Sequence, residues 1–349
     1  MALCDISAWA ARTDFSKLCR LTLPCYTAST DTLADIAARG DLTSLNALCM
    51  LDIDAEGARA VRRLLASLNP HSLQSLRLDG HVDDALFDTI LDRHGESVQH
   101  LSLRPYPDYF SFEDENNPPP PPPIVLTPDL CAQLREKCPN LEDVQLPVDR
   151  TLGDARECAV YRELGRLSRL RRLSLRLRYS VLPNEDTLDG SGEFSNTPEE
   201  IPRAYLSQAF ANAAVDAGLA RAIFDLISST RGGGLQHLQL LPERKAGRYA
   251  PGVYDRLFQD LLRWFARSWS CERRSSGPDV VEIRELHSHG TVEAGTQWQY
   301  LAGKSRHYDG EEIYGEAFGD VWPQTTPRWW EDWKSIPLSQ DDSRAVPPS

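Results

Sequence analysis

One apolar frame, Leu-x-x-Leu-x-Leu, recurs along the chain with different residues in its gaps. Its seven copies begin at residues 18, 45, 73, 98, 141, 170 and 235 and read LCRLTL, LNALCM, LQSLRL, VQHLSL, LEDVQL, LRRLSL and LQHLQL. Four of the six spacings between copies are 25 to 29 residues, which is the period of leucine-rich repeats. The two longer spacings contain insertions at about 106–126 and 180–203. A near-constant period of this length predicts stacked structural repeats.

The segments between the frames have the residue spacing of amphipathic helices. In residues 56–68 the apolar residues recur at steps of three and four and form one stripe: Ala58, Val61, Leu64, Leu65 and Leu68. Thr127 is placed as an N-cap before Pro128, and Gly40 and Gly95 stand where helices should end. Strands alternating with helices predict an α/β protein. We expect an irregular leucine-rich-repeat solenoid over residues 1–290, with a curved parallel sheet inside and helices outside.

A doubly wound α/β domain is the alternative fold. Helices cover both faces of its parallel sheet, so its strands should be continuous apolar runs. Here polar residues alternate with the leucines, as a half-exposed strand requires. In LRRLSLRL, at 170–177, Leu173, Leu175 and Leu177 should point toward the helices, and Arg172 and Arg176 toward the concave face.

The gap positions of the frames predict a partner-binding surface. Arg20 and the acidic residues Asp79 and Asp143 occupy such positions. The candidate partner-binding residues on the predicted concave face are Arg77, His100, Arg104, Arg172, Arg176 and His237. Guanidinium groups bind carboxylates and phosphates through two hydrogen bonds, so we expect a protein partner with an acidic or phosphorylated segment. The alternative is that these arginines are simply solvated on a strand face.

The overall charge argues against other classes of partner. The chain carries a net charge of −13, which disfavours binding to nucleic acid or to anionic membranes by the chain as a whole. Residues 150–178 nevertheless hold nine arginines and three acids, so a nucleic-acid-binding protein using this cluster is an alternative function. No apolar run approaches the ~20 residues of a membrane-spanning helix.

Residues for catalysis or metal binding do not stand out. ELHSHG, at 285–290, places His287 and His289 beside Glu285, but a structural zinc site needs four ligands and no further ligand cluster is near. We therefore predict a non-enzymatic protein with no catalytic residues, no metal and no cofactor. An enzyme on an α/β sheet is the remaining alternative, which a close Ser–His or carboxylate pair in a pocket would favour. The eight cysteines are scattered without a Cys-x-x-Cys pair, which is typical of the cytosol or nucleus.

The C-terminal region is rich in tryptophan. We predict that residues 291–338 form a cap or docking segment, because the end of a solenoid otherwise exposes its apolar core. An exposed interaction hot spot is the alternative. The tryptophans concerned are Trp322, Trp329, Trp330 and Trp333. Residues 339–349 are predicted to be a disordered tail, and the hexaproline run at 118–123 a stiff spacer.

Three stretches resemble a known family. The frames resemble the leucine-rich-repeat superfamily, and CPNLEDVQLP, at 138–147, resembles the repeats of F-box leucine-rich-repeat proteins. AVDAGLARAIFDLIS, at 214–228, and the tail segments GEAFGDVWP and WWEDWKSIPL resemble the C-terminal parts of fungal F-box-type proteins. Such proteins are similar in role to substrate receptors of cullin-RING ubiquitin ligases. The resemblance implies a protein–protein interaction scaffold, the substrate-recognition part of an SCF-type ubiquitin ligase receptor.

Two features depart from that family. Only 17 residues precede the first frame, fewer than the helical hairpin of an F-box, so we expect the F-box to be missing. A Skp-type adaptor and a cullin would be partners only if an F-box lies upstream. The second departure is at the eighth position after each frame start, where leucine-rich repeats often carry Asn and this chain has Tyr26, Ile53, His81, Tyr106, Asp149, Arg178 and Glu243. The turns after the strands must therefore be satisfied without an asparagine ladder.

Overall fold

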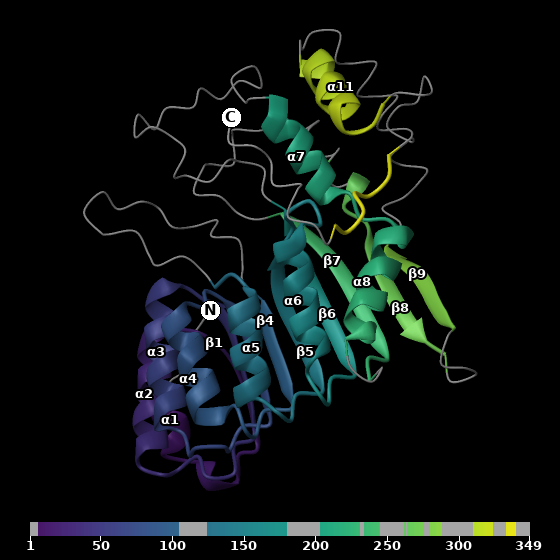
Figure 1. Cartoon of the computed structure of the whole chain (residues 1–349). Helices are drawn as coiled ribbons and strands as arrows, with labels where there is room; N and C mark the ends of the chain where they lie inside the picture. Colours follow the sequence, from purple (N-terminus) through teal and green to yellow (C-terminus); the bar gives the residue numbers. More distant parts are fainter. Residues whose placement is uncertain are drawn as a thin grey trace. The chain divides into compact units, whose positions relative to one another are not determined.

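The structure is a computed structural model of the whole chain (Figure 1). It describes residues 6–104, 124–179, 203–230, 234–244, 262, 264–274, 280–287, 310–323 and 333–339. The protein belongs to the α/β class, with a single nine-stranded, mostly parallel sheet whose strands follow one another in chain order and alternate with helices. The predicted α/β class is therefore confirmed.

The elements have the following bounds. The strands are β1 (Arg20–Pro24), β2 (Ala47–Ile53), β3 (Ser75–Gly80), β4 (His100–Arg104), β5 (Asp143–Asp149), β6 (Arg172–Tyr179), β7 (His237–Arg244), β8 (Ser268–Arg273) and β9 (Val281–His287). The helices are α1 (Ile6–Ala10), the 3-10 helix η1 (Phe15–Lys17), α2 (Thr27–Ala38), α3 (Ala55–Ser67), α4 (Asp84–His94), α5 (Pro128–Lys137), α6 (Ala155–Gly165), α7 (Arg203–Ala213), α8 (Ala217–Ser229) and α11 (Gly310–Val321).

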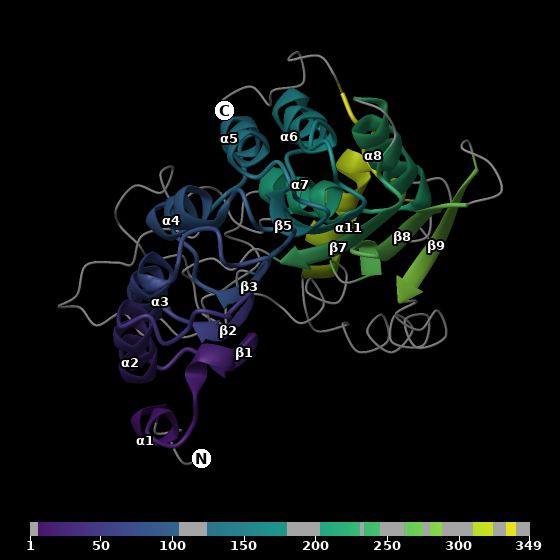
Figure 2. The same ribbon diagram turned by 90° about the horizontal axis from the view of Figure 1, so that it is seen from below.

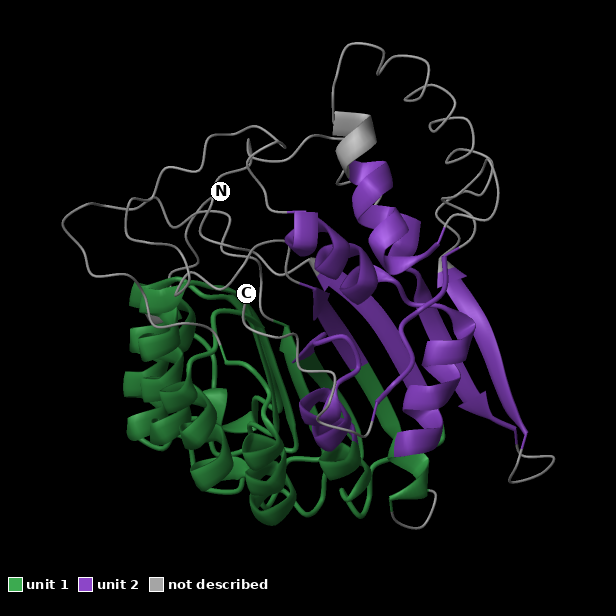
Figure 3. Cartoon of the chain, turned by 45° about the horizontal axis from the view of Figure 1, so that its top comes forward, with its two compact units in different colours: residues 1–147, 162–174, 227–236 green, residues 148–161, 175–226, 237–349 purple. Residues whose placement is uncertain are grey.

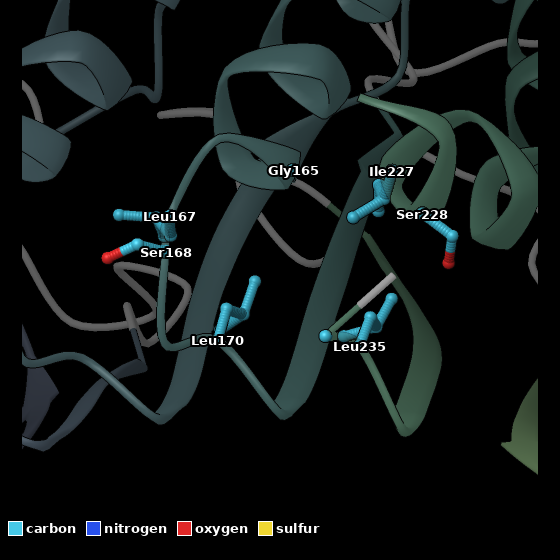
Figure 4. Close-up of a pocket in the computed structure, with 8 residues that line it drawn as sticks. Gly165, Leu167, Ser168, Leu170, Ile227, Ser228 and Leu235 are labelled. Atoms are coloured by element: carbon cyan, nitrogen blue, oxygen red, sulfur yellow. The ribbon is translucent and has the colours of Figure 1, made fainter. Parts of the chain in front are cut away.

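The chain divides into two compact units (Figure 3). The first unit comprises residues 1–147, 162–174 and 227–236. The second unit comprises residues 148–161, 175–226 and 237–349.

Each apolar frame of the sequence coincides with a strand. Strands β1 to β7 all begin two residues after the first residue of a frame. In the first unit the parallel register then aligns the same frame position across neighbouring strands, and the aligned residues are buried: Leu21, Leu48, Leu76, Leu101 and Val144. The repeat in the sequence is therefore a repeat in sheet register.

The backbone repeats in the same way at the start of each strand. The carbonyl oxygen of Gln74 accepts hydrogen bonds from the amides of Gln99 at 2.8 Å and His100 at 3.0 Å, which lie at the start of the following strand. The same double acceptor recurs at the equivalent residues of other repeats in the first unit: Cys19, Asn46, Gln99 and Glu142. This arrangement fixes where each strand enters the sheet.

Side-chain caps start five of the helices, whereas α2 has no side-chain cap. In the first unit, Asp54, Asp83 and Thr127 accept hydrogen bonds from amides in the first turns of α3, α4 and α5. In the second unit, Asp154 and Asp216 do the same for α6 and α8. The N-cap predicted at Thr127, ahead of Pro128, is confirmed. Without an asparagine ladder, the chain thus leaves β2, β3 and β5 through capped helix starts.

Helices α2 to α5 of the first unit lie on one side of strands β1 to β4 (Figure 2). The predicted apolar stripe of α3 faces the sheet, since Ala58, Val61, Leu64, Leu65 and Leu68 are all buried. The strand residues between the leucines are only half-buried or exposed in β1 and β4. This alternation differs from the continuous apolar strands that the doubly wound alternative required.

The last two strands depart from the predicted parallel arrangement. β8 pairs antiparallel with both β7 and β9. β8 and β9 are joined by residues 274–280, a connection too short for the crossover that parallel neighbours need. β8 also lacks the leucine frame, so the sequence pattern did not reveal it. The parallel repeat predicted to reach residue 290 therefore ends at β7.

An aromatic core joins α7, α11 and residues 262 and 264–266 in the second unit. Phe318 of α11 and Trp322, which follows the last residue of the helix, are buried against Phe265, with ring centroids 5.9 and 5.6 Å from it. Arg203 of α7 bonds Glu316 and Asp320 of α11 at the edge of this core. Within the described residues, Trp322 of the predicted cap segment is thus a buried side chain.

A buried ion pair supports the loop that leads from β5 to α6 in the second unit. The Arg150 guanidinium donates to Glu157, and both side chains are completely buried. Glu157 also accepts hydrogen bonds from the Tyr161 hydroxyl at 2.7 Å and from the amides of Thr151 at 2.8 Å and Gly153 at 3.0 Å. One carboxylate therefore binds two amides of the loop, in which Leu152 and Gly153 have positive φ, and the Leu152 amide donates to Asn212 Oδ1 at 2.7 Å.

Several predicted features lie outside the described residues. They are most of the insertions at 106–126 and 180–203, the hexaproline run, His289, Trp329, Trp330 and the tail beyond residue 339.

Candidate partner-binding face

The side of the strands opposite the helices, called here the open face, carries the gap residues of the frames. In the first unit the register places these residues in rows across the strands. One row runs through Arg20, Ala47, Ser75, His100 and Asp143, and the next through Thr22, Cys49, Arg77, Ser102 and Gln145. The leucines fix the register, and the register decides which gap residues become neighbours.

Arg172, Asp143 and His100 form the first polar group on this face. Arg172 Nε donates to Asp143 Oδ2 at 2.9 Å, and His100 Nδ1 lies 4.0 Å from the same oxygen. The side chain of Arg172 is 58% exposed, and those of His100 and Asp143 are 45% and 40% exposed. No hydrogen bond to a described residue engages the two Nη groups of Arg172. These groups can therefore donate to an incoming acceptor.

Arg104 and Ser102 of β4 share a single acceptor on β5. Arg104 Nε and Ser102 Oγ each donate to Gln145 Oε1 at 3.0 Å. A shared amide oxygen holds these two side chains side by side on the face.

Arg77 and Asp79 form a bidentate pair on β3. Arg77 Nε lies 3.0 and 3.1 Å from the two carboxylate oxygens of Asp79, and Nη2 completes the fork. The side chain of Arg77 is 41% exposed, whereas that of Asp79 is only 2% exposed. Asp79 was expected to be open to a partner like the other gap residues, and instead it is buried beneath its ion pair.

The two remaining predicted residues lie in the second unit. Arg176 pairs with Glu243 of β7, and both side chains are largely covered. His237 Nε2 lies 3.0 Å from Ser270 Oγ and 3.5 Å from Glu272 Oε1. The structure thus brings together four of the six predicted residues in the first unit and the other two in the second.

The arginines of residues 150–178 do not form one exposed patch. Arg150 and Arg178 are buried. Five of the nine arginines pair with carboxylates, and three of those carboxylates come from outside the segment: Asp143, Asp149 and Glu243. Much of the local positive charge is therefore neutralised within the protein.

Gln145 is the functional candidate that the sequence reading missed. It occupies a gap position in the frame LEDVQL, and it is the residue that joins Ser102 to Arg104. Because Gln145 is neutral, the pattern of charged gap residues does not identify it. The frame position alone would have identified it.

The Ser–His pair of the second unit has limited scope for nucleophilic catalysis. Ser270 is only 2% exposed, so its hydroxyl is not presented to a substrate. Glu272 approaches the same imidazole nitrogen as Ser270, whereas in a relay the carboxylate orients the opposite nitrogen. On the open face of the first unit, burial raises the pKa of the Cys49 thiol despite nearby Arg77 and Arg104, so this thiol is not activated.

Further chemistry is limited within the described residues. They contain no group of three or more His, Cys, Asp or Glu side chains arranged to hold a metal ion. The seven described cysteines are all free thiols. No helix among the described elements has the length and apolar character needed to cross a lipid bilayer.

The sequence matches none of the protein-family models against which it was compared, and a search of curated proteins finds no match either.

Proposed function

We propose that this protein is a non-enzymatic interaction module of the leucine-rich-repeat type. In this proposal the seven frames form an irregular solenoid, and the C-terminal segment acts as its cap. The open face of the first unit binds an acidic or phosphorylated segment of a protein partner. The free thiols support a reducing location, the cytosol or nucleus.

The observation that carries the proposal is the row of side chains that starts at Arg20 and continues through His100 and Asp143 to Arg172. The side chains at the two ends of this row, Arg20 and Arg172, are exposed. They lie five strand spacings apart, on β1 and β6. At ~4.8 Å per spacing the row is about 24 Å long, which an extended peptide of about seven residues would cross. Acidic groups near the two ends of such a peptide would meet Arg20 and Arg172.

The charge of the face agrees with an anionic partner. The gap residues of the first unit include four arginines, namely Arg20, Arg77, Arg104 and Arg172, against the acids Asp79 and Asp143. This local excess of positive charge belongs to a chain whose net charge is −13. Exposed guanidinium groups favour carboxylate or phosphate oxygens over other acceptors.

A peptide array tests this proposal. The purified full chain is applied to peptides that carry phosphoserine, aspartate, glutamate or serine at matched positions. We compare it with the variant Arg20→Gln/Arg172→Gln and with a control, Arg59→Gln/Arg62→Gln, which loses the same charge from α3 on the helix side. Wild type and the control variant should both retain the anionic peptides. The open-face variant, Arg20→Gln/Arg172→Gln, should bind them about tenfold more weakly. Equal retention by both variants, or no preference for anionic peptides, would contradict the proposal.

We further propose that the module is the substrate-recognition part of an SCF-type ubiquitin ligase receptor. The resemblance of CPNLEDVQLP and of the Trp-rich tail to fungal F-box-type proteins supports this role. Because a Skp-type adaptor and a cullin are expected partners only if an F-box lies upstream, the test mixes them with the protein extended by any segment that its gene encodes upstream of residue 1. A stable complex on gel filtration would support the ligase role. Separate elution would oppose that role while leaving the peptide array as the test of the interaction module.

A further inference from the structure

The segment 333–339 lies against the second unit as an extended strap without helix or strand structure. The indole of Trp333 lies edge-on to Phe265 at 5.5 Å, and the Arg267 guanidinium covers the Trp333 ring at 5.3 Å. The Trp322 indole donates to the carbonyl oxygen of Lys334 at 2.7 Å. These contacts attach the beginning of the strap to the aromatic core.

The far end of the strap lies on the loop that the buried ion pair supports. The amide of Ser339 donates to the carbonyl oxygen of Gly153 at 2.7 Å, and Cys158 Sγ lies 3.3 Å from the carbonyl oxygen of Ser339. A Cβ atom at Gly153 would lie only 3.1 Å from the Pro337 carbonyl oxygen and 3.2 Å from Leu338 Cα. The strap therefore passes over a position that accommodates glycine closely, where φ is +67°.

Ser335 is the centre of the attachment. Its amide donates to Asp216 Oδ2 at 3.0 Å, and its hydroxyl donates to Asp216 Oδ1 at 2.6 Å. Asp216 also caps α8 by accepting the Leu219 amide at 2.8 Å. Burial raises the pKa of Asp216, but the hydrogen bonds from Ser335 and from α8 outweigh it and lower the pKa overall. The carboxylate is therefore charged and has its acceptor positions directed at the strap.

We propose that Ser335 is a phosphorylation site that controls the docking of segment 333–339. A protein kinase would transfer the γ-phosphoryl group of a nucleoside triphosphate to Ser335 Oγ. The Oγ–P bond forms while the bond from that phosphorus to the bridging oxygen breaks, the nucleoside diphosphate leaves, and the hydroxyl proton passes to the kinase's base. The inference does not depend on the proposed function of the open face.

The contact between Ser335 and Asp216 gives phosphorylation a definite direction. The hydroxyl loses the proton that it donates to Asp216, and a group with a charge of about −1.5 to −2 takes its place beside a carboxylate. Donation becomes like-charge repulsion at the shortest contact of the strap. Phosphorylation therefore favours the undocked strap. The kinase would also act on the undocked state, because an extended segment can enter its cleft without unfolding a helix.

The experiment uses the full chain with phosphoserine incorporated at position 335. Hydrogen exchange of the C-terminal peptide and maleimide labelling of Cys158 report docking, and a peptide from α3 serves as the internal control. We expect the amides of Ser335 and Ser339 to exchange about tenfold faster or more, and Cys158 to be labelled faster, with the α3 peptide unchanged. Unchanged exchange at both amides would overturn the inference.

A second variant separates repulsion from simple loss of packing. Asp216→Asn keeps an acceptor that can cap α8 but removes the charge. In this background, phosphoserine at 335 should accelerate exchange much less than it does with aspartate present. Equal acceleration in both backgrounds would show that repulsion is not the cause. Finally, incubation of the protein with a cell extract and a nucleoside triphosphate should place phosphate on Ser335, and mapping that finds none there would refute its assignment as a modification site.

Discussion

Substitution of Glu157 by glutamine tests the physical reasoning most directly, because the change preserves shape and removes one charge. Oε1 of Glu157 accepts from the Arg150 guanidinium and the Tyr161 hydroxyl, while Oε2 accepts from the amides of Thr151 and Gly153. Burial raises the pKa of the Tyr161 hydroxyl well above its ordinary value, so this hydroxyl stays a donor. All four partners of the carboxylate are therefore donors.

The expected cost follows from these four bonds. Whichever way the glutamine side chain is oriented, its NH₂ group faces two donors and leaves both without an acceptor. Each buried donor without a partner costs about 1–3 kcal/mol. Removing one member of a buried ion pair costs about 3–5 kcal/mol. The two estimates agree, so Glu157→Gln should lower the unfolding free energy by about 3–5 kcal/mol.

Urea unfolding followed by hydrogen exchange at Thr151 and Gly153 measures this change in the second unit. The matched control is Asp92→Asn, which breaks the ion pair with Lys137 on the surface, where the Asp92 side chain is 61% exposed. The control should change stability by less than about 1 kcal/mol. If Glu157→Gln also stayed within about 1 kcal/mol of wild type, the buried ion pair would not support its loop as inferred.

Three further predictions concern backbone, thiol chemistry and pH. Gly315→Ala should raise the unfolding free energy by roughly 0.5–1 kcal/mol because α11 has open space there, whereas Gly40→Ala, with equal space but φ at +82°, should lower it by about 1 kcal/mol. Maleimide at mildly alkaline pH should label the exposed Cys19 and leave Cys138 intact in the native protein, because burial raises the pKa of the Cys138 thiol to about 12. The pKa of Asp216 is lowered from 3.8 in the folded protein. The charged carboxylate therefore stabilises the fold fully above pH 3.8, and this stabilisation is lost as the pH falls through the folded-state pKa. The stability difference between wild type and Asp216→Asn should thus shrink as an acid titration proceeds below about pH 4.

The sequence predicted the elements whose signals are local. The frames located strands β1 to β7 because burial on one face of a strand imposes a period of two on its residues. The repeat then gives neighbouring strands the same register. The stripe of α3 and the cap at Thr127 are also short-range patterns, and both are present. β8 was missed because an antiparallel strand outside the repeat has no reason to carry the frame.

The details of the candidate site were harder to predict because its contacts are not local. Arg172 meets Asp143 from 29 residues away, and Arg176 meets Glu243 from 67 residues away. A count of arginines along the chain cannot reveal such pairs, because the pairing depends on which strands become neighbours in the sheet. The frame positions were sufficient to bring Arg77, His100, Arg104 and Arg172 to one face of the first unit, but not to show which of them were already engaged.

That engagement decides which side chains a partner would meet. Asp79 holds a gap position, but its side chain is buried because the Arg77 guanidinium covers it. Replacing Arg77 would leave a buried carboxylate without its partner, so it would test stability more than recognition. Arg172, by contrast, contacts an exposed carboxylate through Nε alone, so its replacement changes the face and spares the core. Loss of peptide binding in a stable Arg172 variant, together with loss of stability in an Arg77 variant, would show that arginines in the gaps of the same frame serve two physical roles on different strands.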